Sequence, residues 1–152
     1  MPTVLGDEID VLAKAKRAIS GDYTPSDNED YMNEAQLDYY RRLLLEWKKS
    51  ILDAAQDTLQ SLQDGPIREP DLNDRASSET DWGIELRTRD RQRKLIAKID
   101  SALRRIEEGE YGYCEVTGEP IGLGRLSARP IATMTVEAQE AHERREKISR
   151  DD

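Results

Sequence analysis

The chain has 152 residues, of which 36% are hydrophobic and 36% charged, and its net charge is −9 at pH 7. A chain this acidic is not expected to bind DNA by itself, because DNA phosphates attract basic surfaces. No apolar run approaches the roughly 20 residues of a membrane span, and a single cysteine cannot form an internal disulfide. We therefore expect a soluble cytoplasmic protein made largely of exposed helices.

Residues 1–32 are expected to form a short helix, over residues 7–19, and a polar linker, both packing on a globular part of the protein. A first long helix then begins at Asn33, which with Gln36 three residues later matches a capping box. Gly65 and Pro66 should end it. Its apolar side chains recur at steps of three and four, which predicts one buried stripe: Leu37, Tyr40, Leu44, Trp47, Ile51, Ala54 or Ala55, Thr58 and Leu62.

A second long helix is predicted to run without interruption to Gly109. Its stripe has the same spacing: Ile84, Thr88, Arg91, Leu95, Ile99, Ala102 and Ile106. Two such helices, each spanning about 45–50 Å, should pack antiparallel as a coiled-coil hairpin over residues 33–108. Because Thr88 and Arg91 are polar, we expect the seam to be looser toward the turn.

Charge is distributed unevenly along the hairpin. Residues 64–81, which include the predicted acidic tip at 65–76, carry six acids and two bases, whereas residues 87–105 carry eight bases and two acids. An acidic tip on a basic shaft suits docking into a complementary partner, although a solvated coiled-coil surface would have a similar composition. A role as N-cap of the second helix would explain Asp71 or Asp74, but not both.

The amino-acid composition changes after the hairpin. Residues 109–134 contain five glycines and two prolines, which predicts a knuckle-like globular region rich in turns. Within it, residues 122–130 are expected to form a loop with one apolar anchor, Leu126. A last helix is predicted over residues 135–152, with Thr135 as its N-cap.

Five segments of the chain form distinctive motifs: 31–36 (YMNEAQ), 71–76 (DLNDRA), 85–96 (ELRTRDRQRKLI), 111–115 (YGYCE) and 125–130 (RLSARP). Together they resemble the DksA/TraR family of bacterial transcription factors. The resemblance covers nearly the whole chain. It implies a fold dominated by α-helices, with a long antiparallel coiled-coil hairpin, a small knuckle-like domain and a C-terminal helix. It also implies a regulatory protein, not an enzyme.

The chain departs from the family pattern at the zinc knuckle. Many members have two C-x-x-C pairs, which fall here on Cys114, Thr117, Thr135 and Ala138. One thiolate, two hydroxyls and a methyl cannot form a tetrahedral zinc site, so the chain resembles a zinc-independent paralogue. A site that joins Cys114 to His142 and a carboxylate is the alternative.

Without zinc, the globular region must be held by apolar packing, for which five residues are candidates: Tyr113, Ile121, Leu126, Ile131 and Val136. Cys114 itself has three possible roles. It is a buried small hydrophobe, a relic without a function, or a redox switch. We disfavour the switch because the neighbouring Glu115 should raise the thiol pKa.

The resemblance also assigns roles to individual residues. The tip would enter the secondary channel of RNA polymerase near its catalytic Mg²⁺. The positions that match family residues are Asp71, Asp74 and Ala76 at the tip, Arg87, Arg91 and Arg125 at the polymerase rim, and Leu95, Lys98 and Arg129 in a pocket for (p)ppGpp. Gln139 falls on a position that is basic in relatives, which predicts a weaker alarmone response.

The function implied is that of a monomeric transcription regulator with no bound cofactor. It would bind bacterial RNA polymerase through the secondary channel, destabilise open promoter complexes and act with (p)ppGpp in the stringent response, without binding DNA specifically or a membrane. Two other functions stay open. One is a Gre-like transcript-cleavage cofactor that uses tip carboxylates to hold a second Mg²⁺, and the other is a structural coiled-coil adaptor.

Overall fold

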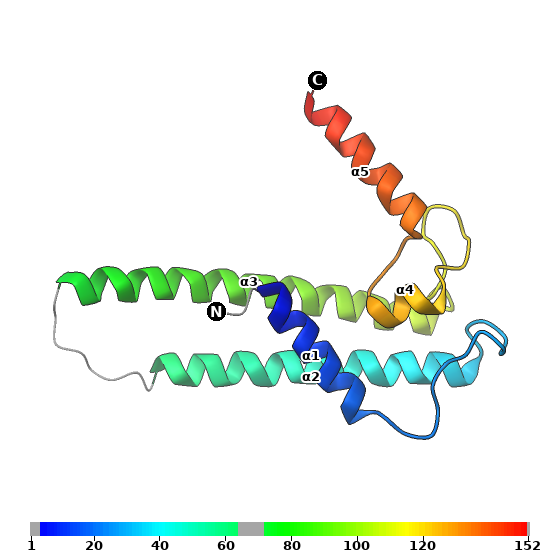
Figure 1. Cartoon of the computed structure of the whole chain (residues 1–152), viewed down its shortest axis with the longest axis horizontal. Helices are drawn as coiled ribbons and strands as arrows, with labels where there is room; N and C mark the ends of the chain where they lie inside the picture. The colour runs from blue at the N-terminus through cyan, green and yellow to red at the C-terminus, as the bar shows by residue number, and fades with distance from the viewer. Residues whose placement is uncertain (1–3, 64–71, 152) are drawn as a thin grey trace. The chain divides into compact units, whose positions relative to one another are not determined.

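The computed structural model describes residues 4–63 and 72–151 of the chain, and most of these residues are helical (Figure 1). The helices are α1 (Val4–Ala18), α2 (Glu34–Gln63), α3 (Leu72–Glu108), α4 (Leu123–Ala128) and α5 (Val136–Asp151). No strand forms in the described ranges, where β pairing is limited to one isolated bridge between Tyr113 and Pro120. No described helix is long and apolar enough to cross a membrane. The predicted α-dominated fold class is confirmed.

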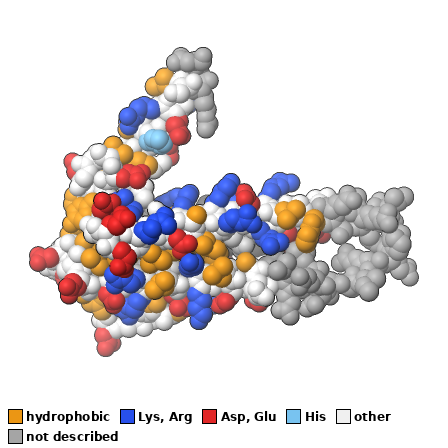
Figure 2. Space-filling view, turned by 180° about the vertical axis from the view of Figure 1, so that it is seen from behind, with side chains coloured by type: hydrophobic (Ala, Val, Ile, Leu, Met, Phe, Trp, Pro, Cys, Tyr) orange, Lys and Arg blue, Asp and Glu red, His pale blue; other side chains and the backbone are white. Residues whose placement is uncertain are grey.

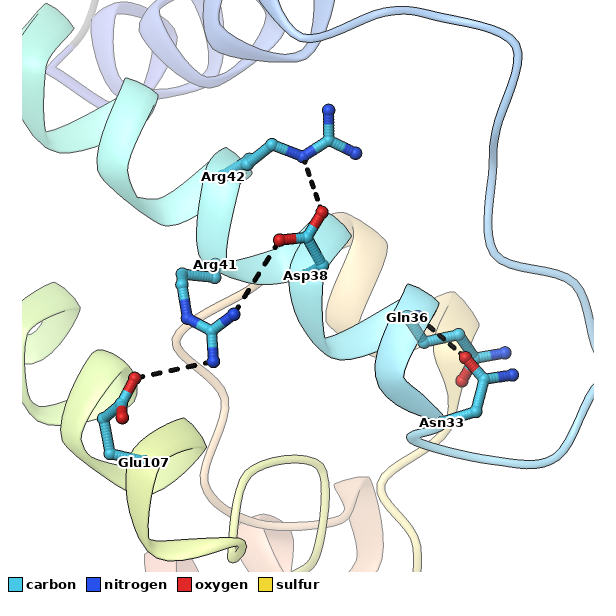
Figure 3. A network of polar contacts seen from close by, with 6 residues as sticks. All are labelled: Asn33, Gln36, Asp38, Arg41, Arg42 and Glu107. Carbon is cyan, nitrogen blue, oxygen red and sulfur yellow. Dashed lines mark hydrogen bonds and ion pairs between the residues drawn. The ribbon is translucent and has the colours of Figure 1, made fainter.

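The start of α2 confirms the predicted capping box. The backbone N–H of Gln36 donates to Asn33 Oδ1 at 2.9 Å (Figure 3). The reciprocal bond is displaced by one residue, because Gln36 Oε1 accepts the N–H of Met32 at 2.8 Å rather than that of Asn33. Gln36 is fully buried, and its Nε2 donates to the Ser26 carbonyl at 3.2 Å. These bonds satisfy amides that a helix start leaves without partners.

The chain forms two compact units. Of the described residues, the first unit contains 4–19, 45–63 and 72–98, and the second contains 20–44 and 99–151. The helix α1 therefore belongs with the outer parts of the hairpin helices, whereas we expected it on the globular part. The linker that follows α1 does belong to the second unit. An amphipathic helix can dock on any apolar surface within reach of its linker, so the sequence does not specify its position.

In the first unit the apolar core is short. Leu12 and Ala15 of α1, Trp47 and Ile51 of α2, and Leu95 of α3 are buried. On the N-terminal side of Leu95 the predicted seam of α3 is wrong, because Ile84 is 47% exposed and Arg91 is exposed as well. The hydroxyl of Thr88 donates to the Ile84 carbonyl at 3.0 Å, within its own helix. The expected loosening of the seam is thus seen in the described residues of α3.

The second unit contains the inner parts of the antiparallel hairpin helices. Their buried side chains form most of the predicted stripe, with Leu43 as an unpredicted addition: Tyr40, Leu43 and Leu44 from α2, and Ile99, Ala102 and Ile106 from α3. Arg41 joins the two helices, pairing with Glu107 at 3.5 Å and with Asp38 at 3.8 Å, and Arg42 also pairs with Asp38 (Figure 3). These side chains are well exposed, so each pair contributes at most about 1 kcal/mol.

The knuckle begins where α3 ends, at Gly109. Arg105 of the last turn of α3 donates through Nη2 to the carbonyls of Tyr113, at 2.8 Å, and Glu110, at 3.1 Å. The segment expected to be a loop with one anchor contains the helix α4, and both Leu123 and Leu126 are buried there.

The predicted apolar core of the knuckle is only partly correct. Ile121 and Leu126 are buried as expected, but Val136 is 44% exposed, and Tyr113 and Ile131 are half-buried. Several residues that were not predicted are also buried there: Tyr111, Leu123, Pro130, Ala132 and Ala138. Val136 is the first residue of α5, and the inward face of that helix is occupied instead by Ala138.

Candidate functional site

The four positions of the degenerate knuckle lie on two turns, one after α3 and one at the start of α5. Cys114 is buried, and its carbonyl accepts the N–H of Gly118 at 2.9 Å to close the first turn. The hydroxyl of Thr135 lies 4.0 Å from Cys114 Sγ and accepts the N–H of Ala138 at 3.2 Å. Thr135 is therefore the N-cap of α5, as predicted, and it also connects that helix to the cysteine turn.

Cys114 is buried as predicted, but its acidity differs from the prediction. Burial raises the pKa of the thiol, while hydrogen bonds from the Thr117 hydroxyl and from the amides of Thr135, Thr117 and Val116 lower it. The lowering prevails, and the pKa is about 6. The expectation that Glu115 raises the pKa was wrong because several donors point at the sulfur. The Glu115 carboxylate instead accepts a bond from the Thr133 hydroxyl at 3.2 Å.

These residues do not fit a zinc ion. A structural site needs four sulfur or nitrogen ligands, and the knuckle positions supply one thiol, two hydroxyls and a methyl. The alternative that joined Cys114 to His142 is not formed either, because His142 Nε2 pairs with Glu146 at 3.1 Å on an exposed face of α5. Across the described residues, no three His, Cys, Asp or Glu side chains gather closely enough to hold a metal.

Two tyrosines that the sequence reasoning missed hold the knuckle together. Tyr31 donates to the Gly112 carbonyl at 2.7 Å and accepts the N–H of Gly122 at 2.9 Å. Tyr111 is buried and donates to the Pro130 carbonyl at 2.8 Å. Burial raises the pKa of Tyr111 well above its ordinary value. The signal for these roles was present in the composition, because a chain with six tyrosines and no phenylalanine places hydroxyls in its core.

Two of the three predicted tip residues lie at the start of α3. Asp71 lies outside the described residues. Asp74 and Ala76 belong to the first turns of α3, which begins at Leu72. Asp74 is the third residue of the helix, so it is not the N-cap. A carboxylate in the first turn is favoured by the partial positive charge of a helix N-terminus.

The predicted polymerase-binding arginines differ in their surroundings. Arg87 and Arg91 are exposed on α3, where they line a shallow surface hollow together with Leu86 and Asp90. Arg91 Nη2 is 3.5 Å from the Thr88 hydroxyl. Arg125 is half-buried in the knuckle, and its Nε donates to the Met134 carbonyl at 2.9 Å. Arg125 therefore supports the fold with one N–H and keeps its others for additional contacts.

The predicted alarmone-binding residues are not equally accessible. Lys98 and Arg129 are exposed, each in its own unit. Leu95 is only 8% exposed, which leaves little of its side chain for a guanine or ribose to contact. Gln139 is half-buried, and its Nε2 donates to Glu143 at 3.1 Å.

The fold and the site together define a class of protein: a helical coiled-coil hairpin joined to a zinc-finger-like knuckle that has kept one of four cysteines. Two family models match the chain. The N-terminal domain of DnaK suppressor protein DksA matches residues 36–106, and the prokaryotic dksA/traR C4-type zinc finger matches residues 109–144. The chain belongs to the DksA/TraR family.

Individual relatives resemble the chain over most of its length. A Caulobacter vibrioides protein named RNA polymerase-binding transcription factor DksA is 63% identical over 131 residues, which cover 86% of this chain and 92% of the relative. The Escherichia coli K12 protein of the same name is 43% identical over 125 residues, covering 82% and 83%. The solved structure of transcription factor DksA2 from Pseudomonas aeruginosa has a TM-score of 0.71 and 38% identity, covering 92% and 98%.

Proposed function

We propose that this chain is a transcription regulator that binds bacterial RNA polymerase directly and does not catalyse a reaction itself. The observation that carries the proposal is the 63% identity to a relative named for RNA polymerase binding, which extends over 86% of the chain. The exposed guanidinium groups of Arg87 and Arg91 on α3 support it, because they are free to make charge-assisted contacts with a partner.

In this proposal the hairpin enters the secondary channel of the polymerase. The shaft arginines hold the hairpin at the rim, and the tip carboxylates of Asp71 and Asp74 reach the region of the catalytic metal. A carboxylate there accepts hydrogen bonds from polymerase side chains or alters the metal environment. The small Ala76 permits close approach. The result is a shorter lifetime of open promoter complexes, without specific DNA contacts. The regulator acts as a cytoplasmic monomer.

A purified transcription assay tests the proposal. The chain is added to RNA polymerase holoenzyme at a ribosomal RNA promoter, and open-complex lifetime and RNA yield are measured. We expect both to decrease. Shortened transcripts in stalled elongation complexes would instead identify a cleavage cofactor of the Gre type, and an unchanged polymerase would identify a structural adaptor.

The regulator is further proposed to respond to (p)ppGpp, through a pocket completed by the polymerase. Lys98 and Arg129 are exposed and suit pyrophosphate groups. Leu95 is proposed to contact the guanine or ribose through the 8% of its surface that is exposed. The neutral Gln139 removes one cation from the pocket. Because half of the pocket belongs to the partner, the isolated chain should bind ppGpp poorly.

Substitutions at the pocket should shift the ppGpp response in opposite directions. Lys98→Ala should raise the ppGpp concentration needed for half-maximal inhibition. Gln139→Lys should lower it about fivefold, which corresponds to ~1 kcal/mol for one new charge-assisted contact. Titration of inhibition at a ribosomal RNA promoter measures both effects. Lys94→Ala is the matched control, because Lys94 lies one turn from Lys98 and already pairs with Asp90 at 3.1 Å. An unchanged titration for Lys98→Ala would show that the pocket is misplaced.

The knuckle is proposed to fold without zinc. A zinc-dependent domain loses its fold when the metal is removed, because metal-binding free energy is then folding free energy. We expect a strong chelator to leave the helical circular dichroism and the melting temperature of this chain unchanged. As a control, the triple variant Thr117→Cys, Thr135→Cys and Ala138→Cys should bind one zinc ion and become sensitive to chelation. Tightly bound zinc in the natural chain, found by elemental analysis, would contradict the proposal.

A further inference from the structure

The outer part of α3 exposes a pair of large hydrophobic side chains. Trp82 is 46% exposed and Leu86 is 48% exposed. At a spacing of four residues they lie one turn apart on the same face of the helix. Trp82 precedes the buried Leu95 by 13 residues, which at about 100° per residue places it on nearly the opposite side of α3 from the seam. The pair therefore lies away from the buried seam position of Leu95.

Basic side chains continue the same face. Arg89 and Arg93 follow Trp82 by seven and eleven residues, so they extend its stripe along the next turns of α3. Neither arginine forms an ion pair with a carboxylate in the part of the chain that the structure describes, whereas the nearby Asp90 is already paired with Lys94 at 3.1 Å. Figure 2 shows hydrophobic side chains next to basic ones along the described helices of the hairpin.

The chemistry of this stripe specifies what it would bind. A half-exposed tryptophan gains hydrophobic free energy when a partner covers the exposed part of its side chain. Tryptophan and arginine are also the residue types that dominate binding energy in protein interfaces. The charged members of the stripe are Arg89 and Arg93, so an acidic surface would complement it. A second copy of this chain would bring the same basic residues against each other, which disfavours self-association through this face.

We infer that Trp82 and Leu86, extended by Arg89 and Arg93, form an anchor that docks in an apolar pocket of RNA polymerase rimmed by carboxylates. The inference rests on the proposed function, and it names a contact that is separate from the tip acids. Leu86 also lines the shallow hollow of Arg87 and Arg91, so the anchor adjoins those two arginines. The apolar pair supplies affinity that salt does not screen, while the two arginines fix the orientation of the shaft.

The test is the affinity of the full chain for purified RNA polymerase core enzyme, measured with fluorescently labelled protein. Trp82→Ala is expected to raise Kd at least tenfold and Leu86→Ala several-fold, whereas Trp82→Phe should stay within about threefold of the natural chain. Ile148→Ala is the matched control, because Ile148 is 63% exposed on α5, and it should leave Kd unchanged. Both Trp82 and Leu86 are exposed helix residues, so helicity by circular dichroism should not change.

The salt dependence of Kd distinguishes the apolar contacts of the anchor from its charged contacts. The ratio of Kd values for Trp82→Ala and the natural chain should be the same at low and high salt, because an apolar contact is not screened. The ratio for Arg93→Ala should shrink as salt rises.

If the natural chain binds polymerase and Trp82→Ala binds equally well, the anchor is wrong and the proposed function stands. If the natural chain does not bind, the proposed function itself fails. Dimerisation of the natural chain that is lost in Trp82→Ala, seen by sedimentation, would assign the face to a second copy and overturn the inference.

Discussion

Asp74→Asn is expected to abolish inhibition at a ribosomal RNA promoter while leaving the affinity for RNA polymerase nearly unchanged. Asparagine keeps the size and one hydrogen-bonding oxygen of aspartate, removes the charge and replaces the other oxygen with an NH2 donor. Asp74 is the third residue of α3, so losing a first-turn carboxylate weakens the helix start by only about 0.3–1 kcal/mol. The fold should therefore remain intact. Competition binding and open-complex lifetime, measured on the same preparation, separate affinity from inhibition.

Arg91→Ala is the complementary variant, since it removes an exposed charge from the shaft and leaves the tip unaltered. It should weaken binding through the loss of a charge-assisted contact, and its inhibition should return at high protein concentration. The inhibition of Asp74→Asn should not return. Full inhibition by Asp74→Asn at saturating protein would show that the tip charge is not the active element.

Features set by neighbouring residues were predictable from the sequence. The cap of α2 depends on Asn33 and Gln36, and the cap of α5 depends on Thr135, because each bond joins residues three or four positions apart. The buried stripe of α3 was predictable from Leu95 to Ile106, because apolar side chains keep a regular spacing in this segment. Local chemistry and burial agree in these segments, which is the condition under which sequence patterns are reliable.

Other features depend on the tertiary structure and were missed for that reason. The helix α4 has only six residues, and its N-cap Gly122 makes no side-chain capping bond, so its sequence carries no start signal. Burial of Leu123 and Leu126 stabilises it instead. The direction of the Cys114 pKa shift was also missed, because the amides that lower the pKa are brought to the sulfur by the fold and not by composition.

The candidate site also combines features that the sequence predicts with features that depend on the tertiary structure. The positions of the degenerate knuckle could be read from their spacing, and the structure brings Cys114 and Thr135 together. The accessibility of Leu95 could not be predicted from the sequence. Leu95 matched both a buried position of the hairpin seam and a position expected to contact a ligand. The roles of the tip and shaft residues depend on the surface of a partner protein, which neither the sequence nor the fold of this chain encodes.

Gly112→Ala is expected to destabilise the chain far more than Gly118→Ala, although both glycines have left-handed backbones. Gly112 has a φ of 90° and Gly118 a φ of 75°. A side chain at either position costs about 1–2 kcal/mol for the backbone conformation. At Gly118 the new Cβ meets nothing within 4 Å, whereas at Gly112 it would lie 2.7 Å from both Cγ and Sδ of Met32. Overpacking of this kind adds about 1–3 kcal/mol.

The clash at Gly112 would also extend to the start of α2. Met32 is itself held at a φ of 55°, and its N–H donates to Gln36 Oε1, so a displaced Met32 disturbs the capping box. Urea unfolding of the two glycine variants measures the difference, and the double variant Gly112→Ala with Met32→Ala should show a favourable coupling, because the shortened side chain makes room for the new methyl. Equal losses of stability in the two single variants would mean that the close approach of Met32 to Gly112 contributes nothing, and that only backbone conformation requires glycine there.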